Sequence, residues 1–515
     1  MKKLQKMFMK WGAAVAKVSL AAAMSTAAWV PVHAADDFGT SVEQLLRTNS
    51  MYWFGVQAPL GPSAPPTSGA YRTPAQPASA QVLLADGLKA EYVTRTIGNN
   101  ADQFAFWPSD ESPTHLIFCI EGTLQNLPGN LPPALVVPKK NPSVQRVHLQ
   151  TGAVDTILRG MTRCDGIRRT PWGTILATEE TSDGGAYEIL GPLQVTNHTI
   201  TNRATGTIVD PDNNPSTSIM KRMSLPVIAF EGLAILPSGV LYGGDELRPG
   251  TDPSDGFGPD SDGGALFKFV PATLRTTNDP ITNLNQSPFA TGTVYALQIS
   301  CVDNKQQFGQ GCEVGNGAWV PVRAANARED AYRGQGGQAT GYYRPEDLEL
   351  DPGYTGEGVR ICWTDTQEEV GKSFGEVVCA VDRLPAAVNV GQRTVTLNRY
   401  VEGDDDFNSF DNLDFQPKTG NVYITEDPGT HGNGDVFACL PDGDDRDIKT
   451  DGCVKILSVK DSSAEPTGFK FSADGTTAYL SIQHSNDVNM PLVDGYATDD
   501  IIKITGFKIH PRFQK

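Results

Sequence analysis

Carboxylates stand at matching places in a phrase that the sequence repeats. The phrase is a run of alternating apolar and polar residues, a turn of Pro, Asp or Gly, and a second alternating run. Glu231, Glu346, Asp411 with Asn412, and Glu465 precede the first run, and Glu179 with Glu180, Asp245 with Glu246, Asp365, and Glu426 with Asp427 follow the second. If the runs are neighbouring strands, these acids converge, and unpaired like charges raise one another's pKa values. We therefore expect the group to bind cations.

The ligand chemistry of this group favours calcium. Well-spaced carboxylate and carbonyl oxygens suit a hard ion that accepts six to eight oxygen ligands in flexible geometry. Histidine is scarce, since the chain has only seven, which disfavours an all-imidazole transition-metal site. The alternative is that these acids are solvated turn residues, or that they bind a stabilising calcium ion without chemistry.

One basic residue stands among these acids. Arg344 lies in Tyr343-Arg344-Pro345-Glu346-Asp347, immediately before an alternating run. A guanidinium held beside acids and metal ions can bind a phosphate or carboxylate through two parallel hydrogen bonds. Arg344 is therefore the candidate catalytic residue, and its alternative role is an ion pair with Glu346 or a neighbour.

The repeated phrase predicts an all-β fold, a β-propeller of about six blades with long loop insertions and a short N-terminal helix. The phrase is clearest at 232–246, 412–427 and 468–484, with weaker copies at 347–365 and 167–180. A four-stranded blade needs about 40–50 residues, and these copies recur at that spacing or wider. The innermost strand of each blade would bring its acids to the mouth of a central channel. A single large β-sandwich is the alternative.

The N-terminal region differs in composition from the rest of the chain. Lysines precede a small-residue apolar run up to Val30, and Val32-His33-Ala34 fits a small-x-small cleavage site, so 1–34 is expected to be a signal peptide. Segment 35–81 would hold an amphipathic helix at 41–51 and a Pro-rich strap, and 82–515 the propeller. A membrane anchor is the alternative for the first segment, but Lys17 leaves too short an apolar run.

The eight cysteines predict disulfides in an exported chain. Three pairs are close in sequence, Cys301 with Cys312, Cys362 with Cys379, and Cys439 with Cys453, which leaves Cys119 for Cys164. We expect the protein to be secreted or periplasmic.

Charge argues against polyanionic partners. The formal net charge is -18, from 42 basic and 60 acidic residues, so nucleic acid and anionic membrane surfaces would be repelled. With 52 glycines and 36 prolines, long helices are excluded as the main architecture.

Five phrases together resemble the PhoX family of secreted bacterial alkaline phosphatases, from about residue 167 to the C-terminus. They are Thr170-Pro-Trp-Gly-Thr174 running into Glu179-Glu180, Arg344-Pro-Glu-Asp-Leu348, Phe407-Asn-Ser-Phe-Asp-Asn-Leu413, Glu465-Pro-Thr-Gly468 and Ser481-Ile-Gln-His484. The resemblance implies a β-propeller with calcium ions and an iron pair, which hydrolyses phosphate monoesters. It implies that Arg344 binds phosphate and that the metal ligands are Glu179, Glu231, Glu346 and Glu465. Asp411 and Asn412 fall in the family's Asp-Asn-Leu phrase and correspond less directly to metal ligands.

The chain departs from that family at one ligand position and in its leader. Thr178 stands where the family has an iron-binding cysteine, and a hydroxyl cannot replace a thiolate as a soft, charged ligand. The leader also lacks the twin arginine common in the family. Both departures favour a calcium-only or otherwise altered cluster, with a calcium and iron cluster as the alternative cofactor set, and they leave a different substrate open.

These observations lead to one expected function and two alternatives. We expect a secreted, metal-dependent phosphoesterase that acts on a small-molecule phosphate ester. A calcium-binding propeller hydrolase of a lactone or triester, or a calcium-stabilised propeller that binds without catalysis, are the alternatives.

Overall fold

The computed structural model describes residues 38–129, 138–248, 263–299, 314–332, 337–366, 374–428, 434–441 and 452–511. The chain divides into two compact units, Met1–Ser41 and Val42–Lys515, and every strand described belongs to the second. No helix in these ranges is long and apolar enough to cross a membrane.

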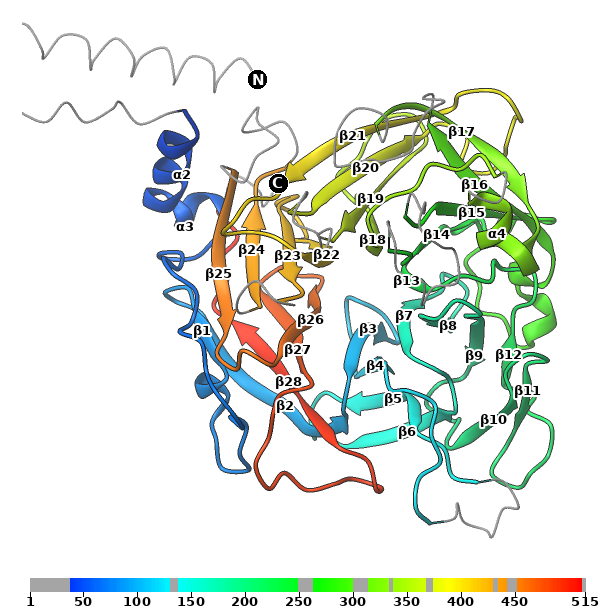
Figure 1. Cartoon of the computed structure of the whole chain (residues 1–515), viewed down its shortest axis with the longest axis horizontal. Helices are drawn as coiled ribbons and strands as arrows, with labels where there is room; N and C mark the ends of the chain where they lie inside the picture. Colours follow the sequence, from blue (N-terminus) through cyan, green and yellow to red (C-terminus); the bar gives the residue numbers. More distant parts are fainter. Residues whose placement is uncertain are drawn as a thin grey trace, which may run out of the picture. The chain divides into compact units, whose positions relative to one another are not determined.

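The second unit is a six-bladed β-propeller, as the repeated phrase predicted. Six inner strands contact one another in order, and the last returns to the first, which closes the ring (Figure 1). These strands are β3 (Ala101–Trp107), β7 (Cys164–Arg169), β13 (Phe230–Ile235), β18 (Pro345–Leu350), β22 (Phe410–Phe415) and β26 (Glu465–Phe471).

The second strand of each blade runs antiparallel to the inner strand and returns to the same end of the channel. These strands are β4 (His115–Ile120), β8 (Thr174–Glu179), β14 (Leu241–Asp245), β19 (Val359–Asp365), β23 (Val422–Glu426) and β27 (Thr477–Gln483). All five repeated phrases identified in the sequence are such pairs.

The third and fourth strands complete the blades outward. They are β5 (Pro142–His148) and β6 (Val154–Arg159), β9 (Ala186–Leu190) and β12 (Ile219–Lys221), β15 (Leu266–Pro271) and β16 (Gly292–Ile299), β20 (Glu376–Asp382) and β21 (Val395–Glu402), β24 (Asp435–Cys439) and β25 (Cys453–Val459), and β28 (Thr498–Thr505) with β2 (Lys89–Gly98). Further strands extend the rims: β10 (His198–Asn202) and β11 (Thr207–Val209) in the first blade, β1 (Val82–Leu84) in the fifth, and β17 (Gly315–Val322), which joins the third blade to the fourth.

Strands from both ends of the chain close the ring. In the sixth blade β2 pairs with β28, with Lys89 opposite Thr505, and in the fifth blade β1 pairs with β25. The segment before β1 is fastened by Arg72, whose buried guanidinium lies 2.6 Å from Asp500 on β28. The closure of this fold therefore depends on contacts between residues about four hundred positions apart.

Few helices are present in the described ranges. They are α2 (Phe38–Thr48), α3 (Ser50–Trp53), α4 (Ala327–Ala331) and the 3-10 turns η1 (Ala78–Ala80), η3 (Leu284–Gln286), η4 (Pro288–Ala290) and η5 (Ala324–Asn326). The short N-terminal helix expected from the sequence is α2. The boundaries 1–34, 35–81 and 82–515 stay predictions.

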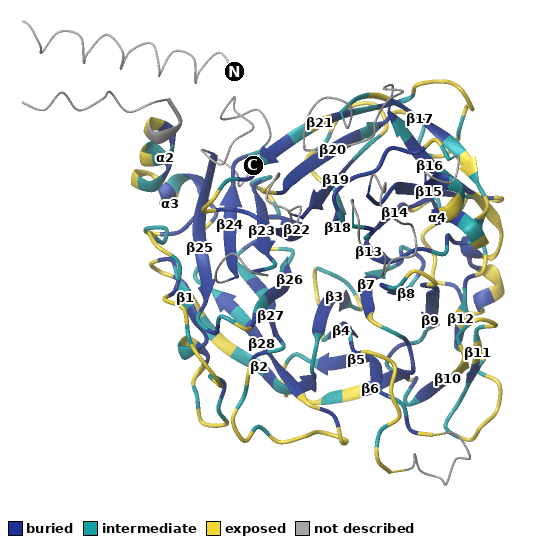
Figure 2. Cartoon of the chain, in the orientation of Figure 1, coloured by how far each residue is buried: buried dark blue, intermediate teal, exposed yellow. Residues whose placement is uncertain are grey.

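The core lies between neighbouring blades. Trp172 and Leu176 of the second blade pack with Phe230 and Leu233 of the third, and similar apolar clusters fill other interfaces between blades. The inner strands are therefore mostly buried on both faces, while exposed residues lie on the outermost strands and in the outer loops (Figure 2). Since apolar side chains stabilise the wedges between blades, the ends of the inner strands are left for polar groups.

Candidate metal and phosphate site

Every inner strand carries a β-bulge near its first residues. The pairing with the second strand shifts after Ala101, Cys164, Phe230, Pro345, Phe410 and Thr467. A bulge places two residues opposite one and redirects a side chain. The first bulged residue is acidic in five of the six blades and glycine in the sixth; the acids are Asp102, Asp165, Glu231, Glu346 and Asp411, and the glycine is Gly468.

A second set of acids follows the second strands. Glu121, Glu180, Glu246 and Asp427 come directly after β4, β8, β14 and β23. Each backbone N–H donates to the carbonyl of the residue before the inner strand of its blade, as Glu180 does to Arg163 at 2.8 Å. The same turn of backbone thus brings both sets of acids to one mouth of the channel.

The two sets form three linked triads. The triads are Asp102, Glu121 and Asp165; Asp165, Glu180 and Glu231; and Glu231, Glu346 and Asp411, with one ligand oxygen from each residue within 4.8 Å of the others in its triad. Asp165 and Glu231 are each shared by two triads. The triads therefore run as a continuous line of oxygen ligands across five neighbouring blades.

The mouth is crowded with negative charge. Burial, followed by the charge of Asp102, raises the pKa of Asp165 well above its ordinary value. Burial and the charge of Asp165 raise the pKa of Glu231 well above its ordinary value. Burial and the charge of Glu465 likewise raise the pKa of Asp411. Such shifts arise because neither solvent nor counter-charge stabilises the ionised carboxylates.

Several carboxylate oxygens at the mouth also lack hydrogen-bond donors. Asp102 Oδ1, Asp165 Oδ1 and Asp411 Oδ2 are buried and accept no hydrogen bond from any described residue. A buried acceptor left unpaired in this way costs free energy, and in native proteins it usually has a partner. Cations bound by these oxygens would satisfy them, so the residues present fit a calcium site.

Arg344 enters the mouth from the fourth blade. It adopts a left-handed backbone conformation, with φ 51°, directly before β18. Its Nε donates to Glu246 Oε1 at 2.6 Å, and its Nη2 lies 3.1 Å from Glu346 Oε1. Burial opposes its charge, but the charges of Glu346 and Glu246 outweigh that effect and raise the pKa of Arg344. The guanidinium is therefore held, charged, beside the triads.

The structure brings together three of the predicted metal ligands, Glu231, Glu346 and Asp411. Asn412 lies beside them: its Nδ2 donates to Asp411 Oδ1 at 3.0 Å, and its Oδ1 accepts the N–H of Gly468. Glu465 stands at the start of β26, where its Oε2 is 3.0 Å from His484 Nε2. Burial lowers the pKa of His484, but Glu465 outweighs it and raises that pKa to about 10.

Glu179 occupies a different position. Its carboxylate accepts hydrogen bonds from Arg203 Nε at 2.7 Å and from the backbone N–H of Thr162 and Gly185. Within the described residues it belongs to none of the triads, whereas its neighbour Glu180 does. Successive side chains of a strand point to opposite faces, so only one of this pair can face the channel.

The sequence interpretation missed Asp102, Glu121 and Asp165. Asp102 and Glu121 belong to the first blade, whose strands were not recognised as a copy of the phrase. Asp165 could have been found, because Asp165-Gly166-Ile167 matches Glu231-Gly232-Leu233 in type and in place. The interpretation began that copy of the phrase at Ile167, after the bulge.

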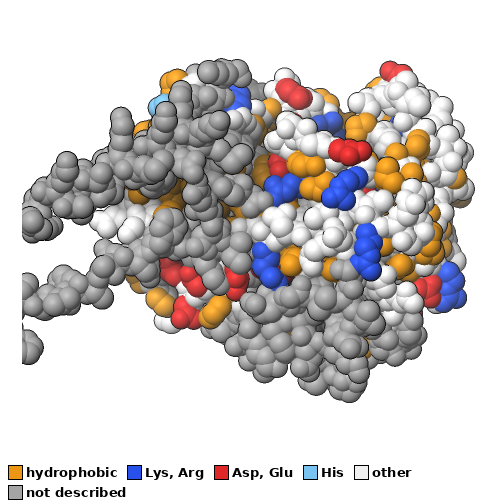
Figure 3. All heavy atoms as spheres, turned by 90° about the horizontal axis from the view of Figure 1, so that it is seen from above, with side chains coloured by type: hydrophobic (Ala, Val, Ile, Leu, Met, Phe, Trp, Pro, Cys, Tyr) orange, Lys and Arg blue, Asp and Glu red, His pale blue; other side chains and the backbone are white. Residues whose placement is uncertain are grey.

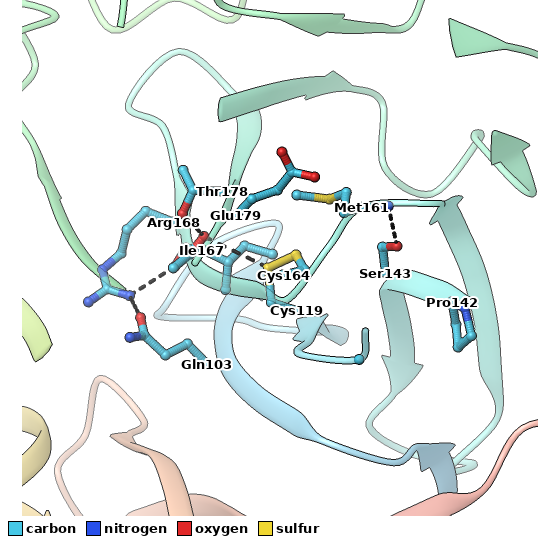
Figure 4. The surroundings of a disulfide bond; sticks show 12 residues. Gln103, Cys119, Pro142, Ser143, Met161, Cys164, Ile167, Arg168, Thr178 and Glu179 are labelled. Carbon is cyan, nitrogen blue, oxygen red and sulfur yellow. Dashed lines mark hydrogen bonds between the residues drawn. A yellow bond between two sulfur atoms is a disulfide. The ribbon is translucent and has the colours of Figure 1, made fainter. Parts of the chain in front are cut away.

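No described cysteine offers a thiolate to the site. Cys119 pairs with Cys164, Cys362 with Cys379 and Cys439 with Cys453, as predicted, while Cys301 and Cys312 lie outside the described ranges. Thr178 Oγ1 donates to the carbonyl of Gly166 at 2.9 Å, next to the Cys119–Cys164 bond (Figure 4). The hydroxyl is thus committed to the backbone, and the ligand set near it consists of oxygens.

The side of the molecule in Figure 3 carries charges of both signs. Basic side chains lie among hydrophobic ones over much of the described surface, and several acidic side chains gather at one edge of this view. The crowding of acids at the channel mouth follows from one backbone position that recurs blade by blade.

One comparison with a solved structure supports this fold. PhoX of Pseudomonas fluorescens in complex with vanadate, a transition-state analogue, matches with 17% identity and a TM-score of 0.51, over 87% of this chain and 98% of that one. A gluconolactonase from Xanthomonas campestris matches with 12% identity and a TM-score of 0.36, over 87% and 98%. No curated protein sequence matches the chain.

The family assignment comes from the sequence. The family described as alkaline phosphatase PhoX matches residues 151–486, a stretch that begins before β7 and includes the bulges of five blades. That stretch contains Arg344 and two of the three triads complete. The chain belongs to the PhoX alkaline phosphatase family and is a phosphoric ester hydrolase.

Proposed function

We propose that the protein is an exported phosphatase that hydrolyses small-molecule phosphate esters at this channel mouth, with calcium ions held by the triads. The observation that carries the proposal is the line of buried, unpaired carboxylate oxygens from Asp102, Asp165 and Asp411. Oxygen ligands alone favour a hard divalent ion, and the paired cysteines disfavour iron held through thiolate.

In this proposal the ligands are the members of the three triads. Glu231, Glu346 and Asp411 are retained from the sequence-based set, and Asp102, Glu121, Asp165 and Glu180 are added to it. Asn412 and Glu465 hold their neighbours by hydrogen bonds, and Glu179 is assigned to an ion pair with Arg203. Bound calcium would supply charge neutralisation for a phosphoryl group.

Arg344 would bind the phosphoryl oxygens. Its guanidinium is charged, sits 14% exposed beside Glu246 and Glu346, and offers several parallel N–H donors. Donors fixed in place before the reaction stabilise charge that develops in the transition state without reorganising. His484 holds its proton at Nε2 against Glu465 and so fixes that carboxylate at the edge of the site.

The experiment that tests the proposal is hydrolysis of 4-nitrophenyl phosphate by the full mature chain before chelation, after chelation and after calcium is added back. We expect activity to be lost and then restored. Glu231→Gln, at a ligand shared by two triads, should lower kcat/KM by about 10²-fold or more. Glu91→Gln, on an exposed residue paired with Lys503 on the outer edge of the sixth blade, is the matched control.

Two results would oppose the proposal. Turnover that survives chelation would show that hydrolysis does not need metal ions bound at the triads. Calcium binding without turnover of any phosphate ester would favour the alternative of a propeller that binds without catalysis.

The proposal that the protein is exported rests on residues 1–34, the expected signal peptide. The three disulfides in the described residues support it, because such bonds persist in oxidising compartments. We expect N-terminal sequencing of the protein recovered outside the cytoplasm to begin at residue 35. A chain that keeps Met1 would contradict cleavage.

A further inference from the structure

Arg163 occupies in the second blade the place that Arg344 occupies in the fourth. Each residue directly precedes an inner strand, and each has a left-handed backbone, with φ 50° and 51°. The carbonyl of each accepts the N–H of the residue after the second strand, Glu180 for Arg163 and Thr366 for Arg344. The propeller repeat therefore aims two arginines at the same mouth from blades two steps apart.

A chain of contacts joins the two arginines. Arg163 Nη2 lies 2.7 Å from Glu180 Oε2, and Glu180 is hydrogen-bonded to Glu246, which accepts the Nε of Arg344. Arg163 also reaches Glu121, with its Nε 2.8 Å from Oε1. The acids that Arg163 contacts, Glu121 and Glu180, are members of two different triads.

The two arginines differ in depth. The side chain of Arg163 is 48% exposed, against 14% for Arg344. Its contacts use Nε and Nη2, and Nη1 donates to no described residue. Arg344 can thus meet a group inside the mouth, while Arg163 stands at the rim with donors directed to a ligand or to solvent.

We propose that Arg163 is a specificity-determining residue, which binds a second anionic group of the substrate while Arg344 binds the phosphoryl group. This inference rests on the proposed function. Arg163 would favour phosphate esters whose alcohol part carries a carboxylate or a further phosphate. Esters with a neutral alcohol part would bind less tightly. A rim guanidinium suits this role because it offers a planar pair of donors that matches either anion.

The test uses two phosphonates that differ only by a carboxylate, methylphosphonate and phosphonoacetate, titrated into the calcium-loaded full chain by calorimetry. We expect wild type to bind phosphonoacetate about tenfold more tightly than methylphosphonate. Arg163→Met should abolish this preference and leave methylphosphonate affinity within about twofold. Arg163→Lys keeps the charge and loses the planar pair of donors. Its preference for phosphonoacetate should lie between those of wild type and Arg163→Met.

Arg169→Met is the matched control. Arg169 ends β7, the strand that Arg163 precedes, and pairs with Asp110 at 2.6 Å, so its loss removes an arginine from the same blade without touching the mouth. It should bind both phosphonates as wild type does. Calcium content of every variant is measured by elemental analysis alongside.

Turnover gives a second readout. The ratio of kcat/KM for 3-phosphoglycerate over glycerol 3-phosphate, which has a neutral hydroxymethyl group in place of the carboxylate, should fall about tenfold in Arg163→Met, mainly through KM. This comparison also serves if Arg163→Met folds poorly, because Arg163→Lys can be used in its place.

The outcomes separate this inference from the proposed function. If wild type binds neither phosphonate and hydrolyses neither ester, the proposed function fails and the inference falls with it. If wild type hydrolyses esters but shows no preference, or if Arg163→Met keeps the preference, only the role of Arg163 is overturned. Equal loss of both phosphonates, or loss of calcium, in Arg163→Met would instead make Arg163 part of the cluster itself.

Discussion

Two groups of carboxylates lie on the same inner strands, and they differ in what faces them. At the mouth, Asp165, Glu231 and Asp411 face mainly other acids. Further along the strands, Asp347, Glu349 and Asp414 face two cations. Arg168 Nη2 lies 2.6 Å from Asp347 and 3.1 Å from Glu349, and Lys470 lies 2.5 Å from Glu349 and 3.8 Å from Asp414.

The difference shows in their protonation. Burial raises the pKa of Glu349, but Arg168 and Lys470 outweigh it, and its pKa lies below the ordinary value. The pKa of Glu231 lies well above the ordinary value, because burial and Asp165 act in the same direction. Burial raises the pKa in both groups, and the counter-charge decides how far. Asp414 has the weakest counter-charge of the inner group, with Lys470 3.8 Å away, and burial raises its pKa to about 7. Most of the charge of the inner group is therefore balanced within the protein, whereas the mouth group could bind cations from outside.

The largest expected effect comes from breaking the inner group. Arg168→Met leaves Asp347 and Glu349 buried with less counter-charge, which should cost about 3–5 kcal/mol of unfolding free energy. Denaturant unfolding of the calcium-loaded protein measures the loss. Arg169→Met is the control on the adjacent residue, whose ion pair is partly exposed and should contribute about 0–1 kcal/mol. Equal effects of the two variants would contradict the distinction between the groups.

Calcium should act on the mouth with a smaller effect. Binding to the folded state alone contributes about 2.7 kcal/mol per site at a hundredfold excess over Kd. For a unit of this size we expect Tm to rise by about 2–3 °C per site, measured by calorimetry with calcium and with chelator. An unchanged melting curve would show that the folded protein does not bind calcium at the mouth. Asp165→Asn should reduce the rise, since Asp165 is shared by two triads.

The smallest expected effect is the pH dependence of the calcium-free protein. Burial and Asp427 raise the pKa of Glu465 to about 7, and burial raises that of Asp499 to about 6. A raised folded-state pKa gives stability that is present below the unfolded value, near 4, and is lost as pH rises through the folded value.

The calcium-free protein should therefore lose about 1–3 kcal/mol between pH 6 and 7.5. Glu246 does not interfere in this window. Burial raises its pKa, but Arg344 and the hydrogen bond with Glu180 outweigh that effect and bring it to about 2. Calcium should flatten the profile, because it replaces the protons, and stability that instead rises with pH without calcium would reverse the sign of this argument.

The repeated phrase predicted the inner and second strands of five blades because alternation and turn residues are local signals. The pairing of Lys89 with Thr505 has no local signal, so closure of the ring could not be read from the sequence. The candidate site differs from the sequence-based set for two local reasons. Successive side chains of a strand alternate in direction, so Glu180 and not the predicted Glu179 belongs to a triad. Asp165 was passed over because it lies in the bulge of β7, before the point where that copy of the phrase was begun.

Calcium titration by calorimetry of wild type, Asp165→Asn and Asp414→Asn tests the central distinction most directly. Asp165 belongs to the mouth group, and Asp414, whose Oδ2 accepts the N–H of Phe471 at 2.7 Å, belongs to the inner group. The account predicts that wild type and Asp414→Asn bind calcium alike and that Asp165→Asn weakens binding about tenfold or more. Equal binding by all three proteins, or a loss confined to Asp414→Asn, would contradict the assignment of the mouth as the cation site.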